Sequence, residues 1–209
     1  MKLQDLTLKQ LLERTAGSDP VPGGGSISAM HGATASALGE MLANLTIGKK
    51  NYLEVEDKMK ELAVSFGQNR VHFLNDIDRD SDAYALVSEG YKMPKSTEDE
   101  QAKRAVKIEE ATKIAATVPM EIAERAFSML SLIEDVTLKG NKNAVTDGMV
   151  SMYTCQSAVL GALLNVRINI SSLKDEDFAN KLADKCNNIE KQTNERVEAL
   201  KLAVKPMLA

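Results

Sequence analysis

Apolar residues recur every three or four positions through most of this 209-residue chain, a spacing that predicts a series of long helices. We expect a short amphipathic helix over Leu3–Arg14 and a helix of small residues over Ser26–Ile47. Further helices are expected over 54–89, 97–138, 145–170 and 175–204. No segment shows the strict alternation of a β-strand. The pattern predicts an all-α, up-and-down bundle of long helices that forms a single domain over residues 1–209.

Local signals mark several helix ends. Thr97 can cap a helix start, because Glu100 follows three residues later. Gly90 is expected to end the preceding helix, and Gly140 the following one. Pro119 lies inside the 97–138 segment, so we expect it to kink that helix or to divide it in two.

The small-residue helix is preceded by a loop with three consecutive glycines. The loop consists of Pro22, Gly23, Gly24, Gly25 and Ser26. Such a loop exposes backbone N–H groups and the positive end of the helix dipole, which suits an anion such as a carboxylate or a phosphate. It has neither the lysine of a phosphate-binding P-loop nor the preceding strand of a dinucleotide site. A tight packing turn is the alternative explanation.

Composition narrows the class of protein. Hydrophobic residues make up 44% and aromatic residues 4%, without tryptophan, which favours packed helices over a sheet. The net charge of −4 argues against nucleic acid as a partner. The first residues lack the apolar core of a signal peptide. The polar residues Glu40 and Asn44 interrupt the apolar run of the small-residue helix, which argues against a membrane span. We therefore expect a cytoplasmic protein with no membrane partner.

Cysteine and histidine patterns give no sign of a metal site. Cys155 and Cys186 fall in different predicted helices and form no CxxC motif, which favours two buried thiols in a reducing compartment. His31 and His72 lack the spacing of a metal-binding helix.

Three aspartates stand close together in the 54–89 helix. Asp78 and Asp82 are four residues apart and share a face, which we expect to be a solvated acidic surface. Asp80 points away from them, beside Tyr84 and toward the apolar side. A buried carboxylate is costly unless it is paired, hydrogen-bonded or protonated, so Asp80 is a candidate acid or base.

Two further charged residues have both a structural and a functional explanation. Lys49 follows the C-terminus of the small-residue helix, where helix-end electrostatics favours a cation, but it could also bind an acidic ligand. Asp147 is either a first-turn helix acid or a second catalytic carboxylate.

Three amide side chains are candidate ligand contacts. Asn141 stands in the loop before Asp147 and suits a hydrogen bond to a heterocycle. Asn165 and Asn169 are four residues apart on one face of an apolar helix, so both need a partner in the protein or in a ligand.

Taken in order, these segments and several others resemble the cyclodeaminase/cyclohydrolase family, which acts on one-carbon tetrahydrofolates. The matching segments are 22–26, 44–52, 78–84, 93–97, 118–119, 140–141, 146–147 and 165–169. They span nearly the whole chain, and 45–56 and 94–108 look most like the bacterial stand-alone cyclohydrolases, which carry no formiminotransferase domain. The resemblance implies a homodimer with a folate site near the subunit contact, and it adds Asn44, Thr46 and Tyr84 to the candidate substrate contacts.

The resemblance also implies a reaction. In cyclohydrolases, water opens the one-carbon bridge of 5,10-methenyltetrahydrofolate to give 10-formyltetrahydrofolate, and in cyclodeaminases a formimino group closes the same ring with loss of ammonia. Both reactions need proton transfers and neither needs a metal or redox cofactor. Asp80, Asp147 and Lys49 are the implied catalytic residues. A non-catalytic helical interaction module, whose small-residue helices only form a dimer core, is the alternative from another class.

Overall fold

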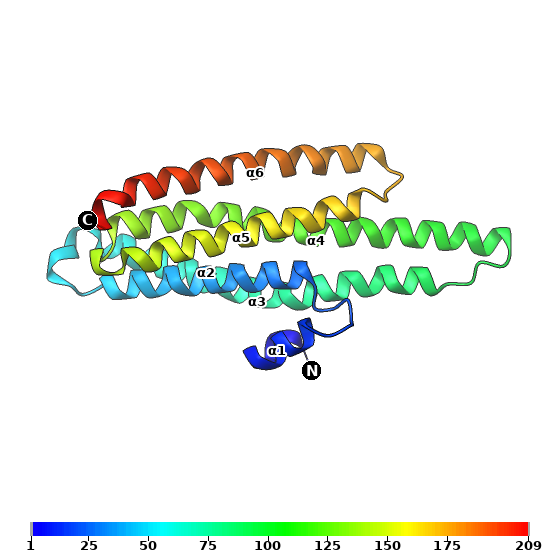
Figure 1. Cartoon of the computed structure of the whole chain (residues 1–209), viewed down its shortest axis with the longest axis horizontal. Helices are drawn as coiled ribbons and strands as arrows, with labels where there is room; N and C mark the ends of the chain where they lie inside the picture. The colour runs from blue at the N-terminus through cyan, green and yellow to red at the C-terminus, as the bar shows by residue number, and fades with distance from the viewer. Residues whose placement is uncertain (1, 209) are drawn as a thin grey trace.

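In the computed structural model, which describes residues 2–208, every regular element is a helix. The α-helices are α1 (Leu8–Thr15), α2 (Gly24–Thr46), α3 (Glu56–Lys92), α4 (Glu98–Lys139), α5 (Val145–Ile170) and α6 (Glu176–Val204). Short 3₁₀ turns are η1 (Leu3–Asp5), η2 (Lys50–Val55), η3 (Lys142–Ala144) and η4 (Lys205–Leu208). From α2 to α6, consecutive helices run in opposite directions (Figure 1). The all-α prediction is confirmed.

The small residues of α2 let this helix lie close to its neighbours. It packs against α3 on one side and α5 on the other, and α5 in turn packs against α4 and α6. Gly32 lies against the ring of Phe73, where a Cβ atom would come within 2.7 Å of ring carbons. A Cβ atom at Gly39 would likewise come within 2.6 Å of ring carbons of Phe66. Two buried aromatic rings of α3 therefore fill the space that side chains on α2 would otherwise occupy.

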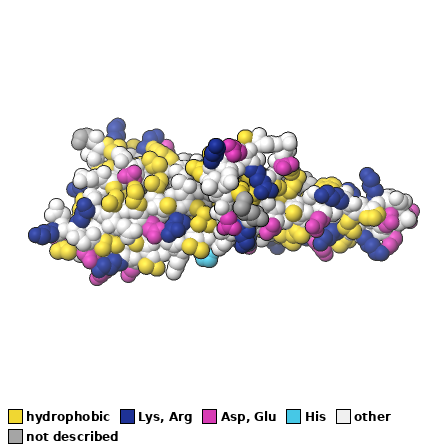
Figure 2. Space-filling view, turned by 90° about the horizontal axis from the view of Figure 1, so that it is seen from below, with side chains coloured by type: hydrophobic (Ala, Val, Ile, Leu, Met, Phe, Trp, Pro, Cys, Tyr) yellow, Lys and Arg dark blue, Asp and Glu magenta, His cyan; other side chains and the backbone are white. Residues whose placement is uncertain are grey.

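The C-terminal part of α3 and the N-terminal part of α4 extend past the other helices as a narrow arm (Figure 1). Charged side chains of both signs line this arm (Figure 2). Gly90 does not end α3, which continues to Lys92. The glycine instead allows close packing, since a Cβ atom at Gly90 would lie 2.9 Å from Ile108 Cγ1 on α4.

The N-terminal segment differs from the single helix expected over Leu3–Arg14. The chain forms η1, and α1 begins only at Leu8 because Thr7 caps it in a reciprocal capping box with Gln10. Asp78 accepts hydrogen bonds from the backbone N–H of Leu3, at 2.6 Å, and from that of Gln4. Asp78 is thus half-buried and anchors η1 to α3, so the expected solvated face at this residue is wrong.

Pro119 does not divide α4, which runs without interruption from Glu98 to Lys139. A proline has no N–H group for the carbonyl four residues earlier, here that of Ala115. The side-chain amide of Asn169, on α5, donates to that carbonyl at 2.7 Å. A hydrogen bond between helices thus replaces the one that proline removes from the helix.

The second small-residue helix is apolar enough to raise the question of a membrane span. The segment Lys142–Ile170 is long and apolar enough to cross a membrane, but half of its most apolar stretch is buried inside the bundle. Its Cys155 is buried, as is Cys186 on α6, and both thiols are free. A helix that is enclosed by other helices in a protein core can be as apolar as a membrane-spanning helix.

The glycine contacts predict opposite effects for two similar substitutions. Gly32→Ala should lower the free energy of unfolding by about 1–3 kcal/mol, because the added methyl group overlaps the Phe73 ring. Gly67→Ala is the matched control: its Cβ would meet the carboxyl group of Glu40 at 3.4 Å or more, so it should stabilise α3 by about 0.5–1 kcal/mol. Denaturant unfolding of both variants measures the difference. Equal effects would show that the ring contact at Gly32 does not constrain the fold.

The contact between Asn169 and Ala115 predicts energetic coupling to Pro119. Asn169→Leu should cost about 1–3 kcal/mol of stability, because the buried Ala115 carbonyl loses its donor. In a Pro119→Ala background the helix supplies its own N–H group, so the same substitution should cost less. A double-mutant cycle by denaturant unfolding measures this coupling. Additive effects would mean that Asn169 does not compensate for the proline.

Candidate functional site

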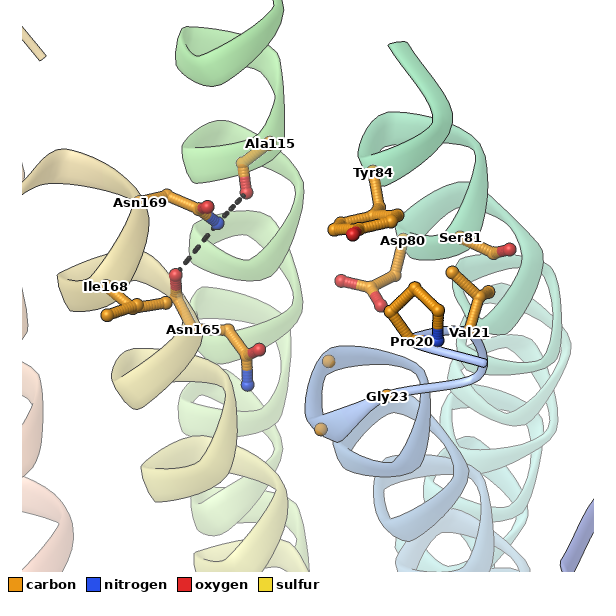
Figure 3. A pocket seen from close by; sticks show the side chains of 12 residues that line it. Pro20, Val21, Gly23, Asp80, Ser81, Tyr84, Ala115, Asn165, Ile168 and Asn169 are labelled. Carbon is orange, nitrogen blue, oxygen red and sulfur yellow. Dashed lines mark hydrogen bonds between the residues drawn. The ribbon is translucent and has the colours of Figure 1, made fainter. Parts of the chain in front are cut away.

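A cavity of about 290 Å³ lies at the N-terminal end of α2, between α3, α4 and α5 (Figure 3). The loop before α2 forms one wall with Pro20, Val21, Gly23, Gly24 and Gly25. The opposite walls consist of Asp80, Ser81 and Tyr84 from α3, Ala115 from α4, and Asn165, Ile168 and Asn169 from α5. The structure therefore brings the glycine loop, one candidate acid and two candidate amides to one place.

Asp80 is held by a serine of the helix that begins at the glycine loop. The hydroxyl of Ser26, which is fully buried, lies 3.0 Å from Asp80 Oδ2 and 2.9 Å from the carbonyl oxygen of Ile77. A hydroxyl has one hydrogen and can donate to only one of these acceptors at a time. Ser26 can donate to an ionised Asp80, or it can accept from a protonated Asp80 while donating to Ile77. The contact accommodates both protonation states of the carboxyl group.

Burial changes the acidity of this carboxyl group. Removal from water raises the pKa of Asp80 above its ordinary value, and the hydrogen bonds from the side chain and backbone of Ser26 only partly oppose that rise. Among residues 2–208, no lysine, arginine or histidine lines the cavity around Asp80. The group therefore keeps its proton to a higher pH than an exposed aspartate, as a residue that exchanges protons with a substrate requires.

The glycines of the loop differ in what they make room for. A Cβ atom at Gly25 would overlap the carboxyl group of Asp80, so only glycine permits the contact between α2 and α3 here. A Cβ atom at Gly24 would meet the flexible side chain of Asn165, at 3.1 Å from Nδ2. Gly23 is the N-cap residue of α2 and has no side chain, so no capping side chain bonds the first N–H groups of the helix.

The two amides on α5 are fixed by hydrogen bonds to the protein. Asn165 Nδ2 donates to the carbonyl of Gly161 at 2.8 Å, and Asn169 Nδ2 donates to the carbonyls of Ala115 and Asn165. Both side chains therefore use their N–H₂ groups within the protein. Across residues 2–208 no donor reaches their Oδ1 atoms, so these remain as acceptors at the cavity.

The rim of the cavity is partly apolar. The Tyr84 ring lies beside Asp80, and Ile168 lies across from it on α5 (Figure 3). Tyr84 is 45% exposed and Ile168 is 69% exposed. A flat heterocycle could be held between these two side chains while its polar edge meets the amide oxygens.

The remaining predicted site residues lie at the opposite end of α2. They are Asn44, Thr46, Lys49, Asn141 and Asp147. α2 has 23 residues, so its two ends are about 33 Å apart at the helical rise. A single chain therefore does not bring Asp147 or Lys49 to Asp80, and the catalytic roles expected for these two residues stay predictions.

At that distant end, Thr46 and Asn141 have structural contacts. The fully buried Thr46 hydroxyl donates to the carbonyl of Leu42 and accepts from the N–H of Asn141 at 2.9 Å. Asn141 Nδ2 donates to the carbonyl of Leu45, and its Oδ1 accepts from the N–H of Asn143. These bonds fasten the connection between α4 and α5 to the end of α2.

A second hollow, of about 410 Å³, lies beside these bonds. Its lining includes Lys49, Lys50, Tyr52, Asn141 and Lys142. The Tyr52 hydroxyl accepts a hydrogen bond from the backbone N–H of Lys142 at 3.0 Å, which joins η2 to η3. We call this surface the basic hollow.

Sequence reasoning missed part of the cavity lining. Ser81, Ala115 and Ile168 were not expected there, although Ser81 and Ile168 are direct neighbours of predicted residues. Conversely, Pro22 and Ser26 are buried behind the glycine loop, and the Val21–Pro22 peptide bond is cis. Within residues 2–208, no three His, Cys, Asp or Glu side chains gather as metal ligands would.

Comparisons with known proteins point to one group of enzymes. The profile of the formiminotransferase-cyclodeaminase family matches residues 7–188. The chain is 38% identical to a methenyltetrahydrofolate cyclohydrolase of Methylorubrum extorquens over 173 residues, 83% of each protein. It is 28% identical to the formimidoyltransferase-cyclodeaminase of Mus musculus over 86% of its own length and 33% of that protein.

A solved structure agrees with these matches. The crystal structure of a formiminotetrahydrofolate cyclodeaminase from Thermotoga maritima has a TM-score of 0.82 and 29% sequence identity. The match covers 99% of this chain and 98% of that one, so both share the whole arrangement of helices. With most of its length matched in sequence and nearly all of it in structure, this chain belongs to the formiminotransferase-cyclodeaminase family.

Proposed function

We propose that this protein is a methenyltetrahydrofolate cyclohydrolase, which converts 5,10-methenyltetrahydrofolate to 10-formyltetrahydrofolate. Two findings support this: the 38% identity to a cyclohydrolase that matches over 83% of its length, and the half-buried Asp80 carboxyl group at a cavity. The identity carries the proposal, because it favours the cyclohydrolase over the related cyclodeaminase, and the Asp80 carboxyl group at the cavity supports it as a group able to exchange protons.

One carboxyl group can serve both halves of this reaction. As water adds to the cationic one-carbon bridge, Asp80 takes one proton from it, and a carbinolamine forms. The bond from that carbon to N5 then breaks, Asp80 returns the proton to N5, and the hydroxyl proton leaves to solvent as the formyl group forms. Water and the methenyl cation thus give the formyl product and one proton.

The surroundings of Asp80 suit these steps. Its raised pKa brings the carboxyl group closer to the range in which it can both accept and return a proton. Ser26 keeps a hydrogen bond with it in either protonation state. While ionised, Asp80 also stabilises the positive charge of the methenyl bridge in a site sheltered from water.

The other walls suit the rest of a folate. The Oδ1 atoms of Asn165 and Asn169 can accept from the N–H groups of a pterin, and Tyr84 offers a ring face. No metal or redox cofactor enters this chemistry. We further propose that the protein acts as a homodimer in the cytoplasm, without nucleic-acid or membrane partners.

The second candidate is formimidoyltetrahydrofolate cyclodeaminase, and the shared fold with the Thermotoga maritima enzyme supports it. Ring closure with loss of ammonia also needs proton transfer at an amidine carbon, so Asp80 would serve in the same position. Assays of the pure protein on methenyl- and formimino-tetrahydrofolate separately, by absorbance and by ammonia release, decide between the two. Activity on neither would favour a non-catalytic helical module.

Two aspartates one turn apart on α3 give a matched test of Asp80. Asp80→Asn should lower kcat about 10²–10⁴-fold, because the proton acceptor is lost. Asp76 is 2% exposed and is paired with Arg79 at 2.6 Å, so Asp76→Asn should chiefly destabilise, by about 1–3 kcal/mol. Near-normal turnover in a folded Asp80→Asn protein would remove this residue from the mechanism.

The raised pKa of Asp80 predicts how stability and rate depend on pH. The folded state binds this proton more tightly than the unfolded state, so the associated stability is present below the ordinary carboxyl pKa and is lost as pH rises through the folded value. Asp80→Asn should therefore be at least as stable as the parent at neutral pH. In the pH profile of kcat/KM, the acidic limb should fall at a higher pH than the pKa of an exposed aspartate would give. Thermal melts and rate profiles measure both, and a destabilised Asp80→Asn protein would contradict the assignment.

The two loop glycines should respond differently to a methyl group. Gly25→Ala should abolish turnover while leaving the fold intact, because the methyl group displaces the Asp80 carboxyl group. Gly24→Ala should lose much less, since the flexible Asn165 side chain can move aside. Steady-state kinetics and circular dichroism measure both. Equal losses would mean that the loop acts by its flexibility rather than by the close approach at Gly25.

A further inference from the structure

Pro119 lies inside α4 and is buried, and it is not one of the residues that line the cavity with Asp80. Ala115, four residues earlier, is 7% exposed and does line that cavity. In a continuous helix the carbonyl of Ala115 would accept a hydrogen bond from the N–H group of residue 119. Proline has no N–H group, so this carbonyl can serve a side chain of another helix instead.

The side chain of Asn169 on α5 donates to this carbonyl. Its Nδ2 atom lies 2.7 Å from the carbonyl oxygen of Ala115 and 2.9 Å from that of Asn165, one turn earlier on α5. Figure 3 shows the amide nitrogen between these two oxygens. The amide has two N–H groups, and the two bonds use both of them.

These two acceptors fix the direction in which the amide of Asn169 is turned. A carbonyl oxygen only accepts, so turning the amide over would place Oδ1 against two other oxygens and break both hydrogen bonds. The amide of Asn165 is held by one bond, in which its Nδ2 donates to the carbonyl of Gly161 at 2.8 Å. Of the two amides that line the cavity, that of Asn169 is therefore the more firmly oriented.

We propose that Pro119 is a positioning residue for the candidate site: it leaves the Ala115 carbonyl without a helical donor, and this carbonyl orients the Asn169 amide so that Oδ1 meets the ligand only as an acceptor. The site then favours a ligand edge that carries N–H groups over an edge that carries acceptors alone. This deepens the proposed function and rests on it for the ligand, a heterocycle with such an edge.

A proline inside a helix can also act by bending that helix, so the two roles must be separated. A bend in α4 would change the cavity whether or not residue 169 is an asparagine. An orienting role acts only through the Asn169 amide. Replacing Pro119 in proteins with and without that amide therefore distinguishes the two roles.

Two substitutions of Pro119 restore the missing N–H group. Pro119→Ala supplies it together with the better helix former, so the fold should be kept. Pro119→Val supplies it with a side chain of three carbons, as many as proline has, so the space left by alanine is controlled for. Circular dichroism checks the fold of both variants, and the two should behave alike in the experiments below.

Hydrogen exchange of the Asn169 side chain tests the orientation without any substrate. The two amide signals are identified in the nuclear magnetic resonance spectrum of the full chain by their loss in Asn169→Leu. In Pro119→Ala the new backbone N–H competes for the Ala115 carbonyl, so these protons should exchange about three- to tenfold faster. The side-chain signals of Asn165 are the control and should keep their rate. Unchanged exchange at Asn169 in a folded Pro119→Ala protein would overturn the proposal.

Kinetics in three backgrounds test the effect on the ligand. In the parent, Pro119→Ala should raise KM for the folate about three- to tenfold with little change in kcat, because recognition weakens while Asp80 is unaltered. In Asn169→Leu, where KM is already raised, the same substitution should raise it no further. In Asn165→Leu it should still raise KM. An equal rise in Asn169→Leu would show that Pro119 acts by shaping α4, against the proposal.

The two experiments separate a failure of this proposal from a failure of the proposed function. If the parent turns over neither methenyl- nor formimino-tetrahydrofolate, the proposed function is wrong, and hydrogen exchange at Asn169 decides the role of Pro119. If the parent is active and exchange is faster in Pro119→Ala, an unchanged KM would show that the oriented oxygen does not recognise the ligand. That result would overturn the proposal and leave the proposed function intact.

Discussion

The close approach of α2 to α3 at Gly25 is the contact on which the candidate site depends. Because Gly25 has no side chain, the Asp80 carboxyl group can lie against the backbone at the start of α2. Ser26, the next residue, then reaches both Asp80 and the Ile77 carbonyl. The same closeness continues along α2, where Gly32 and Gly39 receive the rings of Phe73 and Phe66. The packing that stabilises the bundle therefore also positions the acid.

Asp76 and Asp80 show how burial alone does not define a functional carboxyl group. Both lie on α3, one turn apart, and both are removed from water to some degree. Asp76 has arginine partners, so its charge is compensated within the protein. Burial raises the pKa of Asp80 beside a cavity, and within residues 2–208 it has hydrogen bonds from Ser26 but no ion pair to offset that rise. A site that is less than optimally stable is the expected cost of a group kept ready for proton transfer.

Family members with two activities share this scaffold, and the chemistry of the cavity makes that reasonable. Both reactions pass through a tetrahedral carbon between two nitrogens, and both require a proton to move at the same place. Under the proposed function, the parts shared by both reactions would be Asp80, the amide oxygens of Asn165 and Asn169, and the Tyr84 ring, which line the cavity. Selection between water and ammonia needs only small differences around that carbon.

Local patterns in the sequence were enough to predict the helices and the inward side of α3. Thr97 caps α4 as its spacing with Glu100 indicates, and Asp80 lies on the cavity side because side-chain direction follows from helical periodicity. Periodicity says nothing about position along a neighbouring helix or about contacts between distant segments. Three features depend on such contacts. Asp78 accepts a hydrogen bond from η1, Asn169 donates to the carbonyl that Pro119 leaves without a helical partner, and Ser26 bonds Asp80. The tertiary structure decided which residues gather at each end of α2: Asp80 on α3 lies at its start and Asp147 on α5 near its end, and the helix is about 33 Å long, so one chain does not join the residues that the family resemblance had grouped together.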